Sequence, residues 1–111
     1  MYKQKDIYFA RLNPVVGNEQ GGVRPVVIIS GDGLNEHTQL CIVCPLTTKI
    51  KNYPGSLFVK KNMDNNLSVD SEIRTSHIRS ISKQRLLSKI GEISTMELRE
   101  IFFLLGKVLR H

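Results

Sequence analysis

An arginine held between a glycine pair and a proline is the part of this sequence best suited to chemistry. The segment GNEQGGVRPVVIIS, residues 17–30, leads through Arg24 and Pro25 into a run of β-branched residues. Glycine lets a backbone approach a ligand closely, and proline restricts the residue before it to extended geometry, so the neighbours aim Arg24. A guanidinium presents five N–H donors in a planar fork that suits a phosphate. The segment therefore predicts an anion-binding arginine, with Glu19 near enough in sequence to orient it.

Two further segments carry groups that suit contact with a nucleic acid. Residues 47–55 form a polar loop with hydroxyls, lysines and a tyrosine, and a long strand expected later in the chain adds arginines and a histidine. The two-residue period of a strand predicts that Arg74 and Ser76 share one face. By the same period, His77 and Arg79 share the other face. The candidate side chains on the two segments are Thr47, Thr48, Lys49, Lys51, Tyr53, Arg74, Ser76, His77 and Arg79.

Each of these groups also has a purely structural interpretation. An arginine at a loop–strand junction, such as Arg24, most often forms a surface ion pair, and Thr47 at a strand end most often caps that strand. A strand histidine such as His77 is most often a hydrogen-bonded polar residue, and Tyr53 before a proline most often packs its loop. The type of any one residue does not decide between chemistry and structure.

The overall charge favours a polyanionic partner. The 111-residue chain carries 16 lysines and arginines against 10 acidic residues, a net charge of +6, and its isoelectric point is about 9.6. In so small a chain this favours RNA or DNA, and a merely basic surface is the alternative. The length fits one domain over residues 1–111. No apolar run approaches the about 20 residues of a membrane span, and the N-terminus lacks the apolar core of a secretory signal, so we expect a cytoplasmic protein without a membrane partner.

The cysteines and carboxylates argue against a metal or redox site. Cys41 and Cys44 lie in LCIVCPL, a segment typical of a strand, where residues three apart face opposite sides. A metal or redox CxxC pair needs both sulfurs on one side of a turn, so we interpret both cysteines as small apolar fillers. The loops hold no cluster of carboxylates, histidines or cysteines, and the sequence predicts neither a metal nor another cofactor.

The elements that must position the candidate groups are mostly strands. Apolar and β-branched runs bounded by Gly, Pro and Asn predict strands over residues 6–12, 25–30, 39–46, 56–60 and 70–82. Between the second and third of these, residues 31–38 are expected to form a turn region.

The C-terminal segment has a helical period instead. Ser94 and Glu97 match the capping-box pattern S-x-x-E, which predicts the start of a helix. An apolar stripe follows at helical spacing, at Leu98, Ile101, Phe102, Leu105, Val108 and Leu109. Phe103 and Leu104 widen this stripe. The helix should therefore close one side of a small β-barrel or strongly bent sheet and leave apolar surface for a dimer.

Two motifs in this order resemble a known family. The block EQGGVRP, residues 19–25, is followed by PLTT, residues 45–48, then by DSEIRTSHIRSISKQRL, residues 70–86, and the expected helix. Over nearly the whole chain this resembles the MazF/PemK family, small toxins of type II toxin–antitoxin pairs that cut single-stranded RNA. The resemblance implies a mainly β fold with a C-terminal α-helix, an SH3-like barrel or strongly bent antiparallel sheet of the MazF/CcdB kind. It also implies a homodimer, metal-independent cleavage without a cofactor, and a cognate MazE-like antitoxin.

The resemblance places the family's catalytic pair on Arg24, from its G-x-R-P motif, and on Thr47, the first threonine of its P-x-T-T motif. Other family positions, the E-Q pair and the R-[TS] pair, fall on Glu19, Gln20, Arg79 and Ser80. The family's reaction is attack of the RNA 2′-OH on the adjacent phosphorus, which leaves a 2′,3′-cyclic phosphate and a 5′-OH. In that reaction Arg24 would stabilise charge on the phosphate, Thr47 would donate to a non-bridging oxygen, and His77, if it faces the groove, could transfer a proton.

The chain departs from the family pattern in places. Glutamine is common in the family where this chain has His77, and PemK-like members have His and Asp where this chain has Asn18 and Ser76. It keeps their arginine at Arg74. The RNA-binding residues expected overall are Asn18, Glu19, Gln20, Thr48, Lys49, Lys51, Tyr53, Arg74, Ser76, His77 and Arg79.

Two other kinds of function compete with the ribonuclease. A CcdB-like gyrase poison shares this fold without being an enzyme, but it relies on a C-terminal tryptophan, and this chain has no tryptophan and ends in LRH. A gyrase poison also has no need for the Arg24–Thr47 pair. An inactive nucleic-acid-binding module on an SH3-like barrel is the second alternative.

Overall fold

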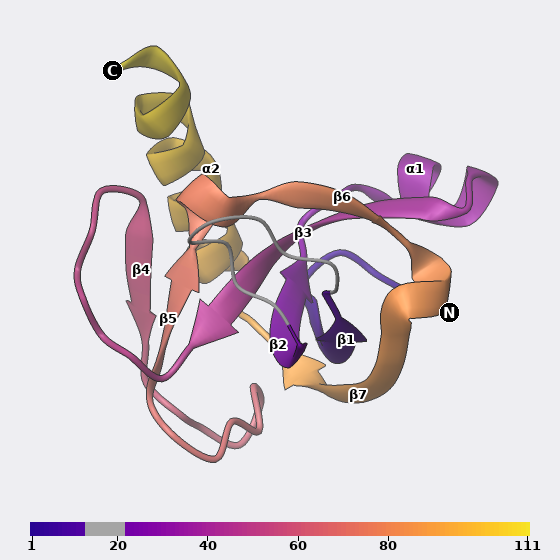
Figure 1. The fold of residues 1–111 in the computed structure, drawn as a ribbon, viewed down its shortest axis with the longest axis horizontal. Coiled ribbons are helices and arrows are strands. Elements are labelled where there is room, and N and C mark those ends of the chain that lie inside the picture. Colours follow the sequence, from indigo (N-terminus) through magenta and orange to yellow (C-terminus); the bar gives the residue numbers. More distant parts are fainter. Residues whose placement is uncertain (13–21) are drawn as a thin grey trace.

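The computed structural model describes residues 1–12 and 22–111, which form a bent sheet with a long C-terminal helix (Figure 1). The strands are β1 Asp6–Arg11, β2 Val23–Ile28, β3 Leu40–Thr47, β4 Ser56–Val59, β5 Ser71–Arg74, β6 Arg79–Ser82 and β7 Leu86–Glu92. The helices are α1 Asp32–His37 and α2 Thr95–Arg110, with short 3₁₀ turns η1 Thr75–His77 and η2 Lys83–Arg85.

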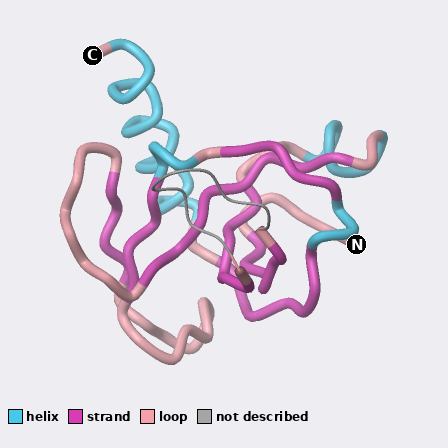
Figure 2. The backbone as a smooth tube through the Cα atoms, in the orientation of Figure 1, coloured by secondary structure: helices cyan, strands magenta, loops and turns pink. Residues whose placement is uncertain are grey.

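The sheet is antiparallel throughout and runs in the order β4-β5-β3-β2-β1-β7. Opposite β2, the edge of β3 pairs with β6 along its first half and with β5 along its second half. This double pairing bends the sheet, and β6 and β7 curve around β1 and β2 (Figures 1 and 2). Among the described strands β4 and β7 do not pair, so the sheet stays open. The strongly bent antiparallel sheet with a C-terminal helix is confirmed.

Apolar side chains cover both faces of the sheet in two clusters. The cluster beneath α2 contains Ile7, Val27, Ile29, Cys44, Leu46, Val59, Ile73, Ile93, Leu98, Ile101 and Leu105. The cluster on the opposite face contains Tyr8, Ala10, Leu12, Val26, Ile28, Cys41, Val43, Ile81 and Leu86. Neighbouring residues of β1 and β2 enter opposite clusters, as the two-residue strand period requires. The continuous apolar runs in the sequence therefore reflect strands buried on both faces.

Cys41 and Cys44 are free thiols that lie in different clusters, as expected for residues three apart on a strand. Burial raises the pKa of Cys44 to about 12, and burial also raises the pKa of Cys41. Thiols that deprotonate so reluctantly are inert as nucleophiles and metal ligands, so both act as the small apolar fillers predicted.

Helix α2 begins at the capping box predicted from the sequence. Ser94 Oγ accepts a hydrogen bond from the Glu97 N–H at 3.0 Å, and Glu97 Oε1 accepts one from the Ser94 N–H at 2.8 Å. The helix buries Leu98, Ile101 and Leu105 against the sheet.

The predicted apolar stripe of α2 is only partly buried, which agrees with the expectation that the helix leaves apolar surface uncovered. Phe102 and Leu109 are exposed, as is Phe103, at 58%. The sheet covers one side of the helix, and the C-terminal end of α2 extends beyond the sheet (Figure 1). Among residues 1–12 and 22–111, nothing buries the exposed members of the stripe.

The single strand expected over residues 70–82 is also wrong, because η1 divides it into β5 and β6. Thr75 is fully buried, and both its N–H, at 3.2 Å, and its Oγ1, at 2.7 Å, donate to the Gly55 carbonyl. The chain turns there, and Arg74 is buried while Ser76 is exposed. The strand period does not continue through the turn, so the predicted sharing of faces does not hold.

Two elements were not foreseen in the sequence. The segment expected as a turn over residues 31–38 contains α1, whose buried Asn35 donates from its side chain to the Ser30 carbonyl at 2.8 Å. Strand β7 is mostly exposed, its apolar residues do not alternate with polar ones, and its pairing with β1 has register shifts, so it lacks the pattern that identifies a strand in a sequence.

Candidate active site

Strand pairing brings the two expected catalytic residues to the same end of the sheet. The last pair between β2 and β3 is Val26 opposite Pro45, and Arg24 and Thr47 come two residues beyond it on their strands. On its other edge Thr47 lies opposite Glu72 of β5. Arg24 is exposed and Thr47 is buried. This end of the sheet therefore brings together an exposed arginine and a largely buried threonine on neighbouring strands.

The chain enters β2 through Gly22, whose φ of 70° is the positive value expected of the glycine pair. The Leu12 N–H donates to the Gly22 carbonyl at 2.8 Å, and Arg79 Nη1 donates to the Leu12 carbonyl at 3.5 Å. Arg79 thus contacts the chain just after β1. The other glycine and three of the expected binding residues lie outside the described residues: Gly21, Asn18, Glu19 and Gln20.

The Thr47 hydroxyl is fixed on one side. Its Oγ1 accepts a hydrogen bond from the Lys49 N–H at 3.2 Å, and across residues 1–12 and 22–111 its own O–H has no acceptor. A threonine hydroxyl has one proton to donate and two lone pairs to accept with. The bond from Lys49 occupies a lone pair and leaves the proton available to an incoming oxygen.

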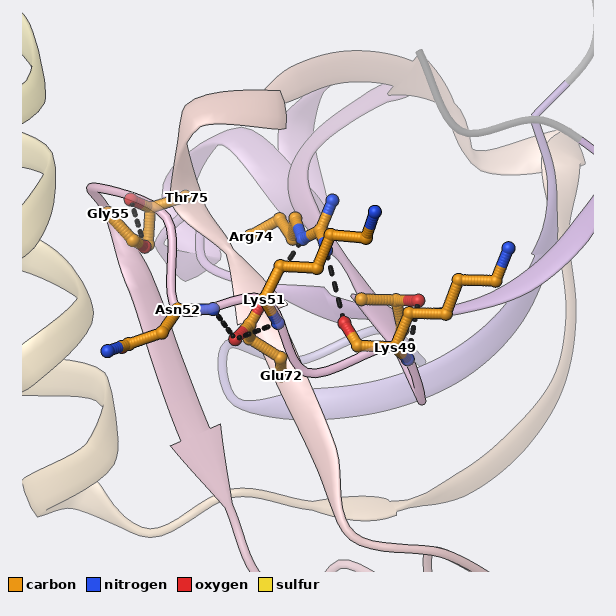
Figure 3. A network of polar contacts seen from close by, with 8 residues as sticks. Lys49, Lys51, Asn52, Gly55, Glu72, Arg74 and Thr75 are labelled. Atoms are coloured by element: carbon orange, nitrogen blue, oxygen red, sulfur yellow. Dashed lines mark hydrogen bonds and ion pairs between the residues drawn. The ribbon is translucent and has the colours of Figure 1, made fainter. Parts of the chain in front are cut away.

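A buried carboxylate organises the loop that follows Thr47 (Figure 3). Glu72 is 1% exposed, and its Oε2 accepts from the backbone N–H groups of Asn52 at 2.8 Å and Lys51 at 3.2 Å. Its Oε1 accepts from Arg74 Nε at 3.1 Å, and Arg74 Nη2 donates to the Lys49 carbonyl at 3.1 Å. The pair therefore binds the loop at three residues, one of them through the guanidinium.

These contacts set the ionisation of Glu72. Burial alone would raise the pKa of its carboxyl, because removal from water disfavours the charged form. The hydrogen bonds from the Asn52 backbone, Arg74, the Lys51 backbone and the Ser56 side chain outweigh that effect. The pKa of Glu72 is lowered from its ordinary value of 4.5, and the carboxylate is ionised at neutral pH.

Acid should therefore remove stability that Glu72 provides. A carboxylate with a lowered folded pKa stabilises the fold above its unfolded pKa of 4.5, and that stabilisation disappears as the pH falls through the folded pKa. We expect the difference in free energy of unfolding between wild type and Glu72→Gln to be largest near neutral pH and to shrink towards about pH 3. Urea titrations at both pH values measure it. A difference that grew on acidification would contradict the lowered pKa.

Next to the Glu72–Arg74 pair, the loop has an exposed basic and aromatic surface. The Tyr53 ring is 52% exposed, with the Arg74 guanidinium carbon 5.3 Å and Lys51 Nζ 6.0 Å from its centroid. Thr48 and Lys49 are exposed beside it. Exposed rings and cations suit base stacking and phosphate contact in single-stranded nucleic acids. Of the candidate residues, the structure gathers Thr47, Thr48, Lys49, Lys51, Tyr53 and Arg74 here.

Two other candidates, Ser76 and His77, lie in the turn η1 after β5. Ser76 lines an open pocket of about 620 Å³ between the loop and α2, together with Tyr53 and Lys107. His77 is half-buried, and its Nδ1 is a buried atom without a hydrogen-bond partner in the described structure.

Glu72 was missed by the sequence reasoning, although a signal for it exists. Two residues before Arg74 on a strand, Glu72 shares its face, and such a pair of opposite charges favours an ion pair. No group of three or more His, Cys, Asp or Glu side chains within residues 1–12 and 22–111 is placed to hold a metal ion.

The chain is similar to proteins of known kind. Residues 3–109 match the family described as PemK-like, MazF-like toxin of type II toxin–antitoxin system. Endoribonuclease MazF of Staphylococcus saprophyticus is 37% identical over 103 residues, which cover 91% of this chain and 85% of that protein. The crystal structure of MazF from Deinococcus radiodurans has a TM-score of 0.84 at 27% identity and covers 98% of this chain and 96% of that chain.

A third similarity concerns the fold alone. An endoribonuclease from a mycobacterial species, solved in complex with its cognate antitoxin, has a TM-score of 0.80 at 20% identity, covering 98% of this chain and 95% of that one. Within the described residues, neither α-helix has the length and apolar character needed to span a membrane. The family match spans nearly the whole sequence and agrees with the S. saprophyticus similarity, so this chain belongs to the PemK-like, MazF-like toxin family of type II toxin–antitoxin systems.

Proposed function

We propose that this chain is a toxin that cuts single-stranded RNA, with Arg24 and Thr47 as its catalytic residues. The observation that carries the proposal is the Thr47 hydroxyl, whose proton has no acceptor in the described structure and which lies at the same strand ends as Arg24. Beside it are exposed cations and an exposed aromatic ring, the groups that bind a single strand through its phosphates and bases.

The reaction we propose needs no nucleophile from the protein. The RNA 2′-oxygen attacks the adjacent phosphorus and the bond to the 5′-oxygen breaks, leaving a 2′,3′-cyclic phosphate and a 5′-OH. The 2′-OH loses its proton, and the departing 5′-oxygen gains one. Arg24 stabilises the charge that grows on the phosphate, and Thr47 donates to a non-bridging oxygen. If His77 faces the bound RNA, a proton transfer by it would use Nε2, because its Nδ1 is buried.

The RNA-binding surface we propose includes both the loop after Thr47 and the segment before β2. Its members are Asn18, Glu19, Gln20, Thr48, Lys49, Lys51, Tyr53, Ser76, His77 and Arg79. Arg74 has a different place, because it is 8% exposed and its guanidinium is bound to Glu72 and to the Lys49 carbonyl. A guanidinium bound in this way supports the surface from within.

The partners we propose follow from the family and from the exposed face of α2. The exposed Phe102 and Phe103 give α2 apolar surface that a second copy of the chain would cover in a homodimer. A MazE-like antitoxin is the expected protein partner, and relatives have been solved as MazE–MazF and as toxin–antitoxin complexes. The cytoplasm is the compartment where mRNA and such an antitoxin would be met.

Purified protein should cut a long single-stranded RNA into discrete fragments, and it should do so equally in excess EDTA and in magnesium. The proposed reaction uses only the RNA 2′-OH and protein donors, so it gives a metal ion no role. Gel analysis of the fragments measures it, with an RNA of little secondary structure so that magnesium does not change the substrate. Activity that disappears in EDTA and returns with magnesium would contradict the proposed reaction, and intact RNA in both conditions would contradict the function.

A further inference from the structure

We propose that Glu72 is a positioning residue for RNA cleavage, acting on Thr47 through the loop of residues 48–53. The inference rests on the proposed function, since the effect on Thr47 matters only if Thr47 takes part in the reaction. Glu72 lies opposite Thr47 on the neighbouring strand, where its side chain is buried and faces no solvent. It therefore touches no RNA, and its influence passes through the groups that it binds.

The two oxygens of the carboxylate have separate tasks. Oε2 accepts from two successive backbone N–H groups, those of Lys51 and Asn52, and Oε1 accepts from Arg74 Nε (Figure 3). An ionised carboxylate accepts such bonds strongly, and buried N–H groups that lose their acceptor are costly. An apolar side chain at this strand position would leave both N–H groups and a buried guanidinium without this acceptor.

The loop has a conformation that needs such support. Asn52 has a φ of 55°, in the left-handed region that non-glycine residues adopt at some cost, and Gly55 has a φ of 86°. The bond from the Asn52 N–H to Glu72, at 2.8 Å, is shorter than those from the Lys51 N–H and Arg74 Nε. The carboxylate thus holds the residue whose backbone is least favourable, and losing the bond should release the loop towards other conformations.

Lys49 links the Glu72–Arg74 pair to Thr47 through its backbone. The Lys49 carbonyl accepts from Arg74 Nη2 at 3.1 Å, and the Lys49 N–H donates to Thr47 Oγ1 at 3.2 Å. The bonds run from Glu72 through Arg74 and Lys49 to the hydroxyl. Because Thr47 Oγ1 accepts from the Lys49 N–H along one lone pair, the hydroxyl proton must point in another direction. The Glu72–Arg74 pair therefore helps to orient the donor that the proposed reaction uses.

The test compares Glu72→Gln with a matched control, Asp6→Asn. Asp6 is also a buried carboxylate that accepts a backbone N–H, from Lys3 at 3.0 Å, and binds a cation, Lys89 Nζ at 3.2 Å. It lies at the other end of β1 from Ala10, the residue opposite Arg24. Both variants lose a buried charge, so a general loss of stability affects both, whereas only Glu72→Gln loosens the loop.

We expect Glu72→Gln to lower kcat about tenfold or more, with the KM for an RNA oligonucleotide within about threefold of wild type, because a misplaced group costs rate more than binding. Asp6→Asn should keep both constants near wild type. On a Thr47→Ala background, Glu72→Gln should lower kcat by much less than it does alone, because its target is gone. Equal effects of Glu72→Gln with and without Thr47, or equal effects of Glu72→Gln and Asp6→Asn, would overturn the inference.

A second variant covers the case in which Glu72→Gln does not fold, and a second measurement does not use activity. The double variant Glu72→Gln/Arg74→Met leaves no buried lone charge, and we expect it to fold yet keep the low kcat. Wild-type rates in that variant would count against positioning. Amide hydrogen exchange at Lys51 and Asn52 should be at least about tenfold faster in Glu72→Gln than in wild type. Unchanged exchange refutes the loop-holding step whether or not the chain cuts RNA, whereas wild-type protein that leaves RNA intact refutes the proposed function instead.

Discussion

A single deoxyribose on the 5′ side of the cut bond should stop cleavage of an RNA oligonucleotide by this chain. The proposed nucleophile is the 2′-oxygen of that sugar, and the substitution removes it while leaving every phosphate in place. Binding should persist, because phosphate contacts supply most of the affinity and one hydroxyl contributes little. Gel analysis of cleavage and a filter or fluorescence binding assay at fixed salt measure the two effects separately.

The control for this substrate carries its single deoxyribose further from the cut bond and should be cut normally. On the all-RNA oligonucleotide, the upstream product should end in a cyclic phosphate and the downstream product should begin with a 5′-hydroxyl. If the substituted oligonucleotide were still cut at the same bond, water or a protein side chain would have to be the nucleophile, and the role given to Thr47 as a donor to the phosphate would need a different reaction around it.

Arg24→Ala should abolish detectable cleavage, a loss of at least the about 10²–10³-fold that follows removal of one preorganised donor from a developing anion. Binding of RNA should weaken only modestly, because Arg24 is one cation among several on this surface. Single-turnover cleavage rates and binding at fixed salt give the two numbers. A large loss of binding with an unchanged rate for bound RNA would assign Arg24 to affinity and not to catalysis.

Arg99→Ala is the matched control for this variant. Arg99 is also exposed and carries the same charge, but it belongs to α2 and not to the ends of β2 and β3. The two variants therefore reduce the net charge equally, and the general attraction for a polyanion falls equally in both. Cleavage that falls to the same extent in Arg99→Ala would mean that net charge, and not the place of Arg24, is responsible.

The sequence could predict one part of the site, Thr47 and the loop after it, but not the other part, Glu72. Thr47 and the loop after it became candidates because hydroxyls, lysines and a tyrosine follow an apolar run, which is a local pattern. The catalytic role of Thr47 was predicted from the family motif. Glu72 was not found, because its role depends on two backbone N–H groups some 20 residues earlier in the chain. A hydrogen bond between a strand and a distant loop leaves no periodic trace in a sequence.

The 70–82 segment shows the same limit for the fold. Its alternation of polar and apolar residues is that of one strand, and the bonds from Thr75 to the Gly55 carbonyl hold the chain at the turn that separates β5 from β6. Those bonds join segments that meet through the pairing of β4 and β5. The division in turn lets one edge of β3 pair with two strands, which bends the sheet.

Local patterns along the chain were enough to predict the strand-rich class, the capped C-terminal helix, the opposite faces of Cys41 and Cys44, and the resemblance to the family, which in turn implied an antiparallel sheet. Each of these depends on short-range periods, local capping or contiguous motifs, which are properties of neighbouring residues. The folded structure was needed to show that Arg74 turns inward to a buried carboxylate and that Phe102 stays exposed. It was also needed to show that the Thr47 hydroxyl has no acceptor among the described residues. Those outcomes depend on which residues distant in sequence form hydrogen bonds with a side chain or cover its surface. Strand pairing across the sheet brings such residues together.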